Sequence, residues 1–143
     1  MIRAFLLEPD CQGQRLGIDR IVQLGSGRTL KIDEKKRERD YGDILLEFVS
    51  VDRTNAPGWM EKDLQIDYLA YAFLPSQRCY LLPWNMLRRV WANWGRMWIS
   101  YGAKNLGGFD IVAAANRGYQ TWSVAVPTKV LTTAIKNAMV IQL

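Results

Sequence analysis

Asp19, Asp33 and Lys35 have the residue types and the spacing that hydrolysis of a phosphodiester could use. Asp19 interrupts the apolar segment 17–24, and an acid in an otherwise packed strand needs a partner. Two carboxylates that converge on one point suit a hard divalent cation with oxygen ligands, Mg²⁺ or Mn²⁺. Such an ion polarises a phosphate and lowers the pKa of a bound water, while Lys35 could orient that water and stabilise the charge growing on phosphorus.

A hairpin is expected to position these residues. Segment 17–24 is typical of a short strand, Gly25-Ser26-Gly27 is a tight-turn signal, and 28–37 is a second extended segment. The turn could bring Asp33 back beside Asp19. The alternative interpretation is a solvated, charged strand end whose acids pair with basic neighbours.

Strand periodicity decides which charges of the second strand share a face. One face carries Leu30, Ile32, Glu34 and Lys36, and the other carries Lys31, Asp33 and Lys35. If the two apolar residues of the first face point to the core, Asp33 and Lys35 form the site, and we favour this phase. The other phase, with Glu34 and Lys36 as the working pair, stays open because the strand could be covered on both faces or could bulge.

The residue inventory excludes several other chemistries. The chain has no histidine, and its two cysteines, Cys11 and Cys79, lie far apart, so a Cys/His metal site, a Ser-His-Asp triad and a Cys-His nucleophile are excluded. Both cysteines are expected to be reduced, buried thiols. Because neither a signal peptide nor an apolar run of about 18 residues is present, we expect a cytoplasmic protein without a membrane partner.

Length and charge indicate one basic domain. The 143 residues, 49% of them hydrophobic, suit a single domain over 1–143. The net charge of +5 makes a polyanionic partner such as DNA plausible. Four cations near the candidate acids could form a phosphate-binding rim, although a solvated charged face is the alternative. They are Lys31, Lys36, Arg37 and Arg39.

The remaining patterns predict an α+β or mixed α/β domain whose strands gather in one sheet. Strands are expected at 41–51, 64–74, 79–82 and 119–126, and helices at 83–101 and 127–138. The segment through Arg15 is expected to be a short helix or an irregular lead-in. On the first helix, Trp91, Trp94 and Trp98 form a stripe that faces the core or a dimer partner, or else offers stacking surfaces to bases.

The order of these motifs resembles the PD-(D/E)XK nuclease superfamily, in particular its small phage- and prophage-encoded members. The resemblance rests first on Asp19, the turn, the acid-x-lysine strand 32–37 and the apolar strand 43–47 that ends in Glu47. Segments 58–59, 67–71 and 124–127 are similar to later landmarks of that group.

The resemblance implies a central mixed β-sheet flanked by helices and metal-dependent cleavage of DNA, with branched or recombination-intermediate DNA as the substrate by analogy. It implies that Asp19 and Asp33 hold Mg²⁺ or Mn²⁺, with Lys35 beside them. The sequence departs from the pattern of this superfamily in two ways. No proline precedes Asp19, and the N-terminal segment is shorter than the helix that usually contributes an extra acid to the site, which leaves Glu8 as the candidate for that acid. Glu47 is either a further acid or a structural ion-pair partner of Arg37 or Arg39.

Two consequences for partners follow. A homodimer would let two sites cut two strands, and the aromatic helix is where we expect its interface. The rival hypothesis is a non-catalytic phage protein on the same fold, acting in the host cytoplasm, that binds nucleic acid or blocks a host nuclease or defence complex. Metal dependence separates the two hypotheses, because only the nuclease needs Asp33 for its activity.

Overall fold

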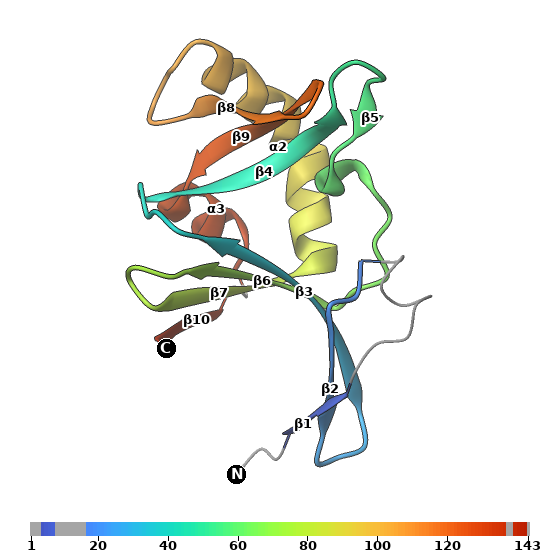
Figure 1. The fold of residues 1–143 in the computed structure, drawn as a ribbon. Helices are drawn as coiled ribbons and strands as arrows, with labels where there is room; N and C mark the ends of the chain where they lie inside the picture. The colour runs from blue at the N-terminus through green and yellow to red at the C-terminus, as the bar shows by residue number, and fades with distance from the viewer. Residues whose placement is uncertain (1–3, 8–16, 137–138, 143) are drawn as a thin grey trace. The chain divides into compact units, whose positions relative to one another are not determined.

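The computed structural model describes residues 4–7, 17–136 and 139–142, and the chain divides into two compact units. Unit 1 comprises Met1–Asp40, Leu64–Met86 and Asn137–Leu143, and unit 2 comprises Tyr41–Asp63 and Leu87–Lys136. Each unit is therefore assembled from segments that are separated in sequence by parts of the other. The elements of both units are labelled in Figure 1.

Unit 1 contains a six-stranded mixed sheet with the order β1-β2-β3-β6-β7-β10. Its strands are β1 (Ala4–Leu7), β2 (Arg20–Leu24), β3 (Thr29–Arg37), β6 (Tyr68–Phe73), β7 (Arg78–Pro83) and β10 (Met139–Gln142). Neighbours are antiparallel except β3 and β6, which run parallel. This parallel pair makes the sheet mixed, as predicted, although the sheet holds only part of the described strands.

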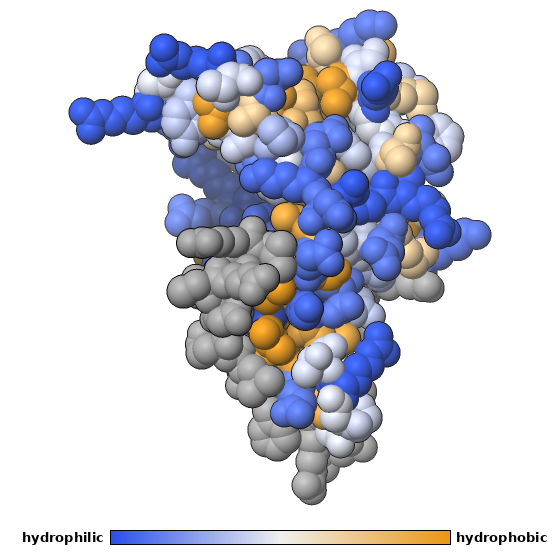
Figure 2. Space-filling view, turned by 90° about the vertical axis from the view of Figure 1, so that its right-hand side faces the viewer, coloured by the Kyte–Doolittle hydropathy of each residue, from blue (hydrophilic) through white to orange (hydrophobic). Residues whose placement is uncertain are grey.

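The predicted hairpin is confirmed as β2 and β3. The Leu24 N–H donates to the Arg28 carbonyl at 2.7 Å, and Gly27 takes a φ of +87°, a conformation that favours glycine. Arg20 of β2 pairs with Ile32 of β3. In the lower part of Figure 2, where this hairpin lies, hydrophobic and hydrophilic residues stand side by side on the surface.

The buried face of β3 is the one that carries Asp33, contrary to the expectation that Leu30 and Ile32 point to the core. Both of these apolar residues are half-buried, whereas Asp33 is only 3% exposed. Asp33 is paired with Leu69 of β6, which is in turn paired with Leu82 of β7, and both leucines are fully buried. The central strands of the sheet therefore decide which face of β3 is buried.

Unit 2 contains a four-stranded antiparallel sheet with the order β5-β4-β9-β8. Its strands are β4 (Asp43–Val51), β5 (Ala56–Pro57), β8 (Asp110–Asn116) and β9 (Tyr119–Pro127). Cross-strand pairs of fully buried residues form its core, such as Leu46 with Val124 and Ile44 with Val126. Helix α3 (Thr128–Ala134) packs against β4 and β9, and a short 3-10 helix, η1 (Trp59–Glu61), packs against β4.

The predicted long helix is confirmed as α2 (Trp84–Ala103), most of which belongs to unit 2. Trp91 and Trp98 are buried on it, whereas Trp94 is 47% exposed, so the predicted tryptophan stripe is only partly core-facing. No helix in the described part of the chain is long and apolar enough to span a membrane. Cys79 is a buried free thiol, as expected, and Cys11 lies outside the described residues.

The fold class is α+β, as predicted, but the expectation of a single sheet is wrong because the strands divide between two sheets. Four of the described strands were not predicted: β1, where a helix or an irregular segment was expected, the two-residue β5, β8 and β10. The last helix ends at Ala134, earlier than expected. Alanine has a low strand propensity, so the alanines of β8 favour a strand only weakly. The pairing of β8 with β9 stabilises the extended conformation instead.

Gly58 allows the chain before η1 to approach the backbone of β4 closely. A Cβ at this position would lie 2.4 Å from the Glu47 carbonyl oxygen, although the φ of −70° is ordinary. We therefore expect Gly58→Ala to lower the free energy of unfolding by about 2 kcal/mol through steric overlap, measured by denaturant titration. An unchanged free energy would mean that the irregular register of β4 between Glu47 and Val49 absorbs the methyl group.

Candidate metal centre

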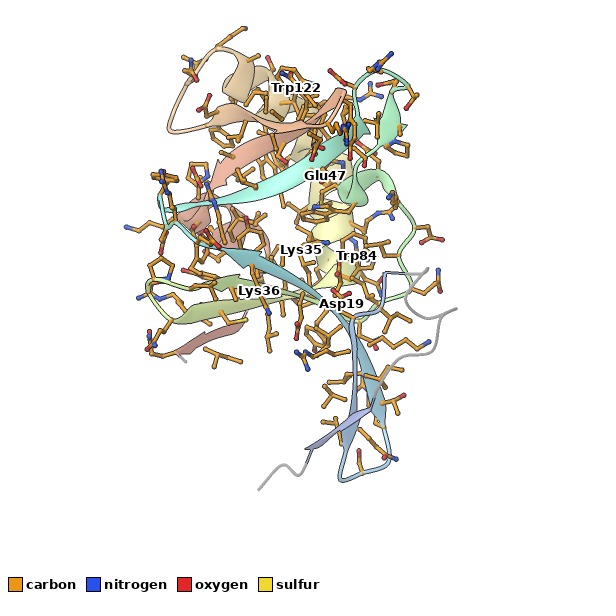
Figure 3. All side chains as sticks on the ribbon, viewed as in Figure 1. Asp19, Lys35, Lys36, Glu47, Trp84 and Trp122 are labelled. Atoms are coloured by element: carbon orange, nitrogen blue, oxygen red, sulfur yellow. The ribbon has the colours of Figure 1, made fainter. Side chains whose placement is uncertain are left out.

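The β2–β3 hairpin brings Asp19 and Asp33 together, as the sequence predicted. Asp19 immediately precedes β2, whose first residue pairs with Ile32, so Asp19 lies beside Asp33. The two carboxyl groups share a side-chain hydrogen bond. The Glu34 backbone N–H also donates to Asp19 Oδ2 at 2.9 Å, which fixes the orientation of this carboxylate. Figure 3 shows Asp19 at the base of the hairpin.

Lys35 lies on the same face of β3 as Asp33. Its Nζ is 3.1 Å from Asp33 Oδ2, and its side chain is 32% exposed. The ammonium group is therefore fixed by the buried acid and can still be reached by a substrate. Asp19 is exposed, so the pair of acids has one buried and one accessible member.

The two acids titrate differently. Burial and, second to it, the hydrogen bond with Asp19 raise the pKa of Asp33 to about 7, against the opposing effect of Lys35. The hydrogen bond from Asp33 lowers the pKa of Asp19, against the effect of burial. Two carboxylates this close cannot both ionise without a compensating charge. Below about pH 7, a proton on Asp33 supplies that compensation.

The side chains of Glu34 and Lys36 are directed away from this site. The Glu34 carboxylate pairs with the Arg20 guanidinium across the hairpin, on the face opposite Asp33. Lys36 follows on that same face and is exposed. Of the two phases considered for β3, the structure therefore brings Asp33 and Lys35, and not Glu34 and Lys36, to Asp19. Glu34 contributes only its backbone N–H to the site.

The four predicted phosphate-binding cations do not form one patch on β3. Strand alternation puts Lys31 and Arg37 on the face of Asp33, and Lys36 on the opposite face. Arg39 follows the end of the strand and is exposed. A phosphate chain that approaches Lys35 would therefore meet Lys31 and Arg37 on the same face of the hairpin.

The two further acids considered for the site have separate positions. Glu47 belongs to unit 2, where its Oε1 accepts a hydrogen bond from the Trp59 backbone N–H at 3.3 Å. Glu8 lies outside the described residues. Among the described residues, no group of three or more acids, cysteines or histidines forms a metal-binding cluster.

The donor set of the Asp19–Asp33 pair nevertheless fits a hard divalent cation. Mg²⁺ is often held by one or two carboxylates and completes its shell with water and substrate phosphate oxygens. A divalent cation bound by Asp19 and Asp33 would neutralise the charges that a proton on Asp33 neutralises below about pH 7. Lys35, whose Nζ lies 3.1 Å from Asp33 Oδ2, would be the group near such a cation that could act on a substrate.

Arg20 is the residue near the site that the sequence analysis missed. Its guanidinium pairs with the Glu34 carboxylate, and its positive charge is also one of the smaller causes that lower the pKa of Asp19. The hairpin register could have revealed it, because a turn centred on Ser26 sets Arg20 opposite Ile32 and within reach of Glu34.

Comparison of the chain with protein-family models, with curated proteins and with solved structures gave no match.

Proposed function

We propose that the protein is a metal-dependent endonuclease that hydrolyses DNA phosphodiesters, on a restriction-endonuclease-like arrangement of catalytic residues. The observation that supports this proposal is the hydrogen-bonded pair of Asp19 and Asp33 with Lys35 Nζ 3.1 Å from the buried acid. Asp19 and Asp33 would hold Mg²⁺ or Mn²⁺, which when bound polarises the phosphate and acidifies a water.

The chain's own residues would supply positioning and charge. Lys35 would hold the attacking water by hydrogen bonding and stabilise the negative charge that develops on the phosphate oxygens. Its contact with Asp33 fixes the ammonium in place before substrate arrives, so no reorganisation is needed during the reaction. Lys31 and Arg37 share the face of Asp33 and would contact neighbouring phosphates.

The proposal is tested by incubating labelled single-stranded, duplex and four-way-junction DNA with the full chain in Mg²⁺, Mn²⁺ or EDTA. We expect cleavage in either metal and none in EDTA. Comparing the rate on the four-way junction with the rate on duplex DNA tests the proposed preference for branched DNA. Binding of Mn²⁺, followed by electron paramagnetic resonance, gives a readout that does not depend on activity. A folded protein that cleaves none of these substrates and binds no Mn²⁺ would contradict the proposal and favour the non-catalytic binding protein.

Lys35→Met should reduce cleavage about 100-fold while leaving the affinity for Mn²⁺ within about threefold, because it removes the charge and keeps the apolar stem. Lys36→Met is the matched control on the opposite face of β3 and should stay within about threefold of the wild type. Single-turnover cleavage rates at saturating metal measure both effects. Equal losses in the two variants would indicate a general loss of DNA contacts instead.

A further inference from the structure

The four-stranded sheet of unit 2 has two edge strands, β5 and β8. β5 has two residues, one of them Pro57, which has no backbone N–H to offer to another strand. β8 has seven residues, Asp110–Asn116, with no proline, no lysine and no bulge in its pairing with β9. Proteins commonly use those features to protect an edge strand from pairing with another chain, so β8 is an unprotected edge.

The register of β9 shows which backbone groups of β8 point to this edge. The Gln120 N–H donates to Asp52 Oδ1 at 2.9 Å, and the Gln120 carbonyl accepts from the Asp52 N–H at 3.1 Å, so the Gln120 backbone is directed away from β8. Ala115 lies directly opposite Gln120 and therefore directs its N–H and carbonyl groups outward. Alternation along the strand adds Ala113 and Ile111 to the outward set.

These outward groups are open to another strand. The Ile111 N–H donates to the neighbouring Asp110 Oδ1 at 2.8 Å, and the backbones of Ala113 and Ala115 have no partner outside the β8–β9 pair among the described residues. Both alanines are exposed, and their methyl groups leave room for a second backbone. The edge of β8 therefore offers unpaired donors and acceptors at regular spacing.

The charges at the two ends of β8 complement each other. Asp110 begins the strand, Arg117 follows its end, and no charged residue lies between them. Both are exposed, and neither forms an ion pair within the described part of the chain. When such a strand meets a second copy of itself in antiparallel orientation, the acidic end of each copy comes beside the basic end of the other.

We propose that the protein forms a two-fold symmetric homodimer by antiparallel pairing of β8 with β8 of a second copy. Matching the outward groups sets Ala113, at the centre of the strand, opposite the partner's Ala113. Asp110 then lies opposite the partner's Asn116, within reach of the long side chain of the partner's Arg117. The two four-stranded sheets become one continuous sheet. The inference concerns unit 2 alone and does not depend on the proposed nuclease activity.

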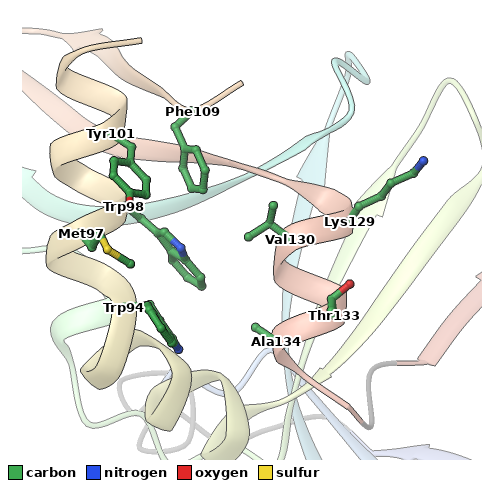
Figure 4. A pocket seen from close by; sticks show the side chains of 9 residues that line it. All are labelled: Trp94, Met97, Trp98, Tyr101, Phe109, Lys129, Val130, Thr133 and Ala134. Carbon is green, nitrogen blue, oxygen red and sulfur yellow. The ribbon is translucent and has the colours of Figure 1, made fainter. Parts of the chain in front are cut away.

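Helix α2, on which the sequence predicted a dimer interface, offers a competing surface at the apolar cavity of about 650 Å³ between α2 and α3. In Figure 4, Trp94 of α2 and Val130 of α3 border this cavity, and the Lys129 side chain points away from it. The lining contains no acidic side chain, so two copies meeting there would not complement each other in charge. The β8 edge adds complementary charges and backbone hydrogen bonds to the contact.

Sedimentation of the full-length protein between about 1 and about 300 µM tests the association, which we expect in the micromolar range. Ala113→Pro removes an outward N–H and should weaken the dimer at least about tenfold while the β8–β9 pair is kept. Trp94→Glu, at the exposed surface of α2, should change the dissociation constant less than about twofold. A chain that stays monomeric, or a dimer that survives Ala113→Pro, would overturn the proposal, and loss of the dimer in Trp94→Glu would assign the interface to α2 instead.

Exchange of the end charges tests contact between the copies. Asp110→Lys and Arg117→Glu each bring like charges together at both ends of the interface and should weaken the dimer about fivefold. The double variant restores opposite charges and should return the dissociation constant to within about twofold of the wild type. A double variant as weak as either single variant would show that these ends do not meet.

Ala113→Cys keeps the proposal testable if the proline variant fails to fold. In the proposed register the two Cα atoms at position 113 are about 5.5 Å apart, a separation that a disulfide can bridge, so mild oxidation should cross-link this variant. Ala115→Cys is the matched control, because its two copies lie about 14 Å apart along the ladder. It should cross-link no more than the wild type with its native cysteines. Equal cross-linking of the two variants would overturn the proposed pairing.

Discussion

Replacing Asp33 with asparagine is expected to lower metal-dependent DNA cleavage at least about 1,000-fold. Asparagine keeps the size of the side chain but removes the charge that, together with Asp19, would hold the cation. Glu34→Gln, one residue away, should stay within about threefold of the wild type, because the Glu34 side chain pairs with Arg20 on the opposite face. Single-turnover rates in Mg²⁺ measure the contrast between two neighbouring acids.

The control for this contrast is DNA affinity in EDTA, which Asp33→Asn should leave within about threefold of the wild type. Retained affinity with lost cleavage separates a chemical defect from a folding or binding defect. If Glu34→Gln were inactive and Asp33→Asn active, the working pair would be Glu34 with Lys36, and the assignment of Asp33 would be wrong.

Asp33 should also make the stability of the fold depend on pH. The folded protein keeps a proton on this acid up to about pH 7, whereas the unfolded chain releases it near pH 3.8, the ordinary pKa of an aspartate. Stability therefore falls as pH rises through this window, because the folded state binds the additional proton. We therefore compare the unfolding free energy of Asp33→Asn with that of the wild type at each pH. On going from pH 5 to pH 8, this difference should shift in favour of the variant by on the order of 3 kcal/mol.

Urea titrations of both proteins at the two pH values measure this difference, and Asp63→Asn, at a side chain that is 88% exposed, is the control that should show almost none. Mg²⁺ should stabilise the wild type more at pH 8 than at pH 5, because protons compete with the cation for the same carboxylates. A wild-type–variant difference that is equal at pH 5 and pH 8 would show that Asp33 ionises alike in the folded and unfolded states.

Local sequence patterns were sufficient to predict which side chains meet at the candidate centre. The turn at Gly25–Gly27 determines the hairpin register, and the register sets Asp19 beside Asp33. Alternation then links Asp33 with Lys35. The premise that Ile32 faces the core was nevertheless wrong, because the buried face of β3 is chosen by its pairing with β6, and that partner lies beyond the reach of any local pattern.

The division into two sheets could not be predicted for the same physical reason. Apolar strands 41–51 and 64–74 look alike in hydrophobicity, yet β4 pairs with β9 and β6 with β3. Pairing is decided by long-range packing, whereas the helical spacing of α2 is a property of one segment and was predicted. Strand β8 was missed because Ala113, Ala114 and Ala115 carry almost no strand signal of their own.

The parallel pairing of β3 with β6 has a consequence for how the protein forms during synthesis. Tyr41–Asp63 of unit 2 is translated between these two strands, and Leu87–Lys136 is translated before β10 can join β7. On the ribosome, unit 2 can therefore be completed before the sheet of unit 1 acquires its last edge strand. Neither unit corresponds to a continuous fragment of the gene, so a nascent chain interrupted before residue 137 would carry a finished unit 2 beside an incomplete candidate metal-binding unit.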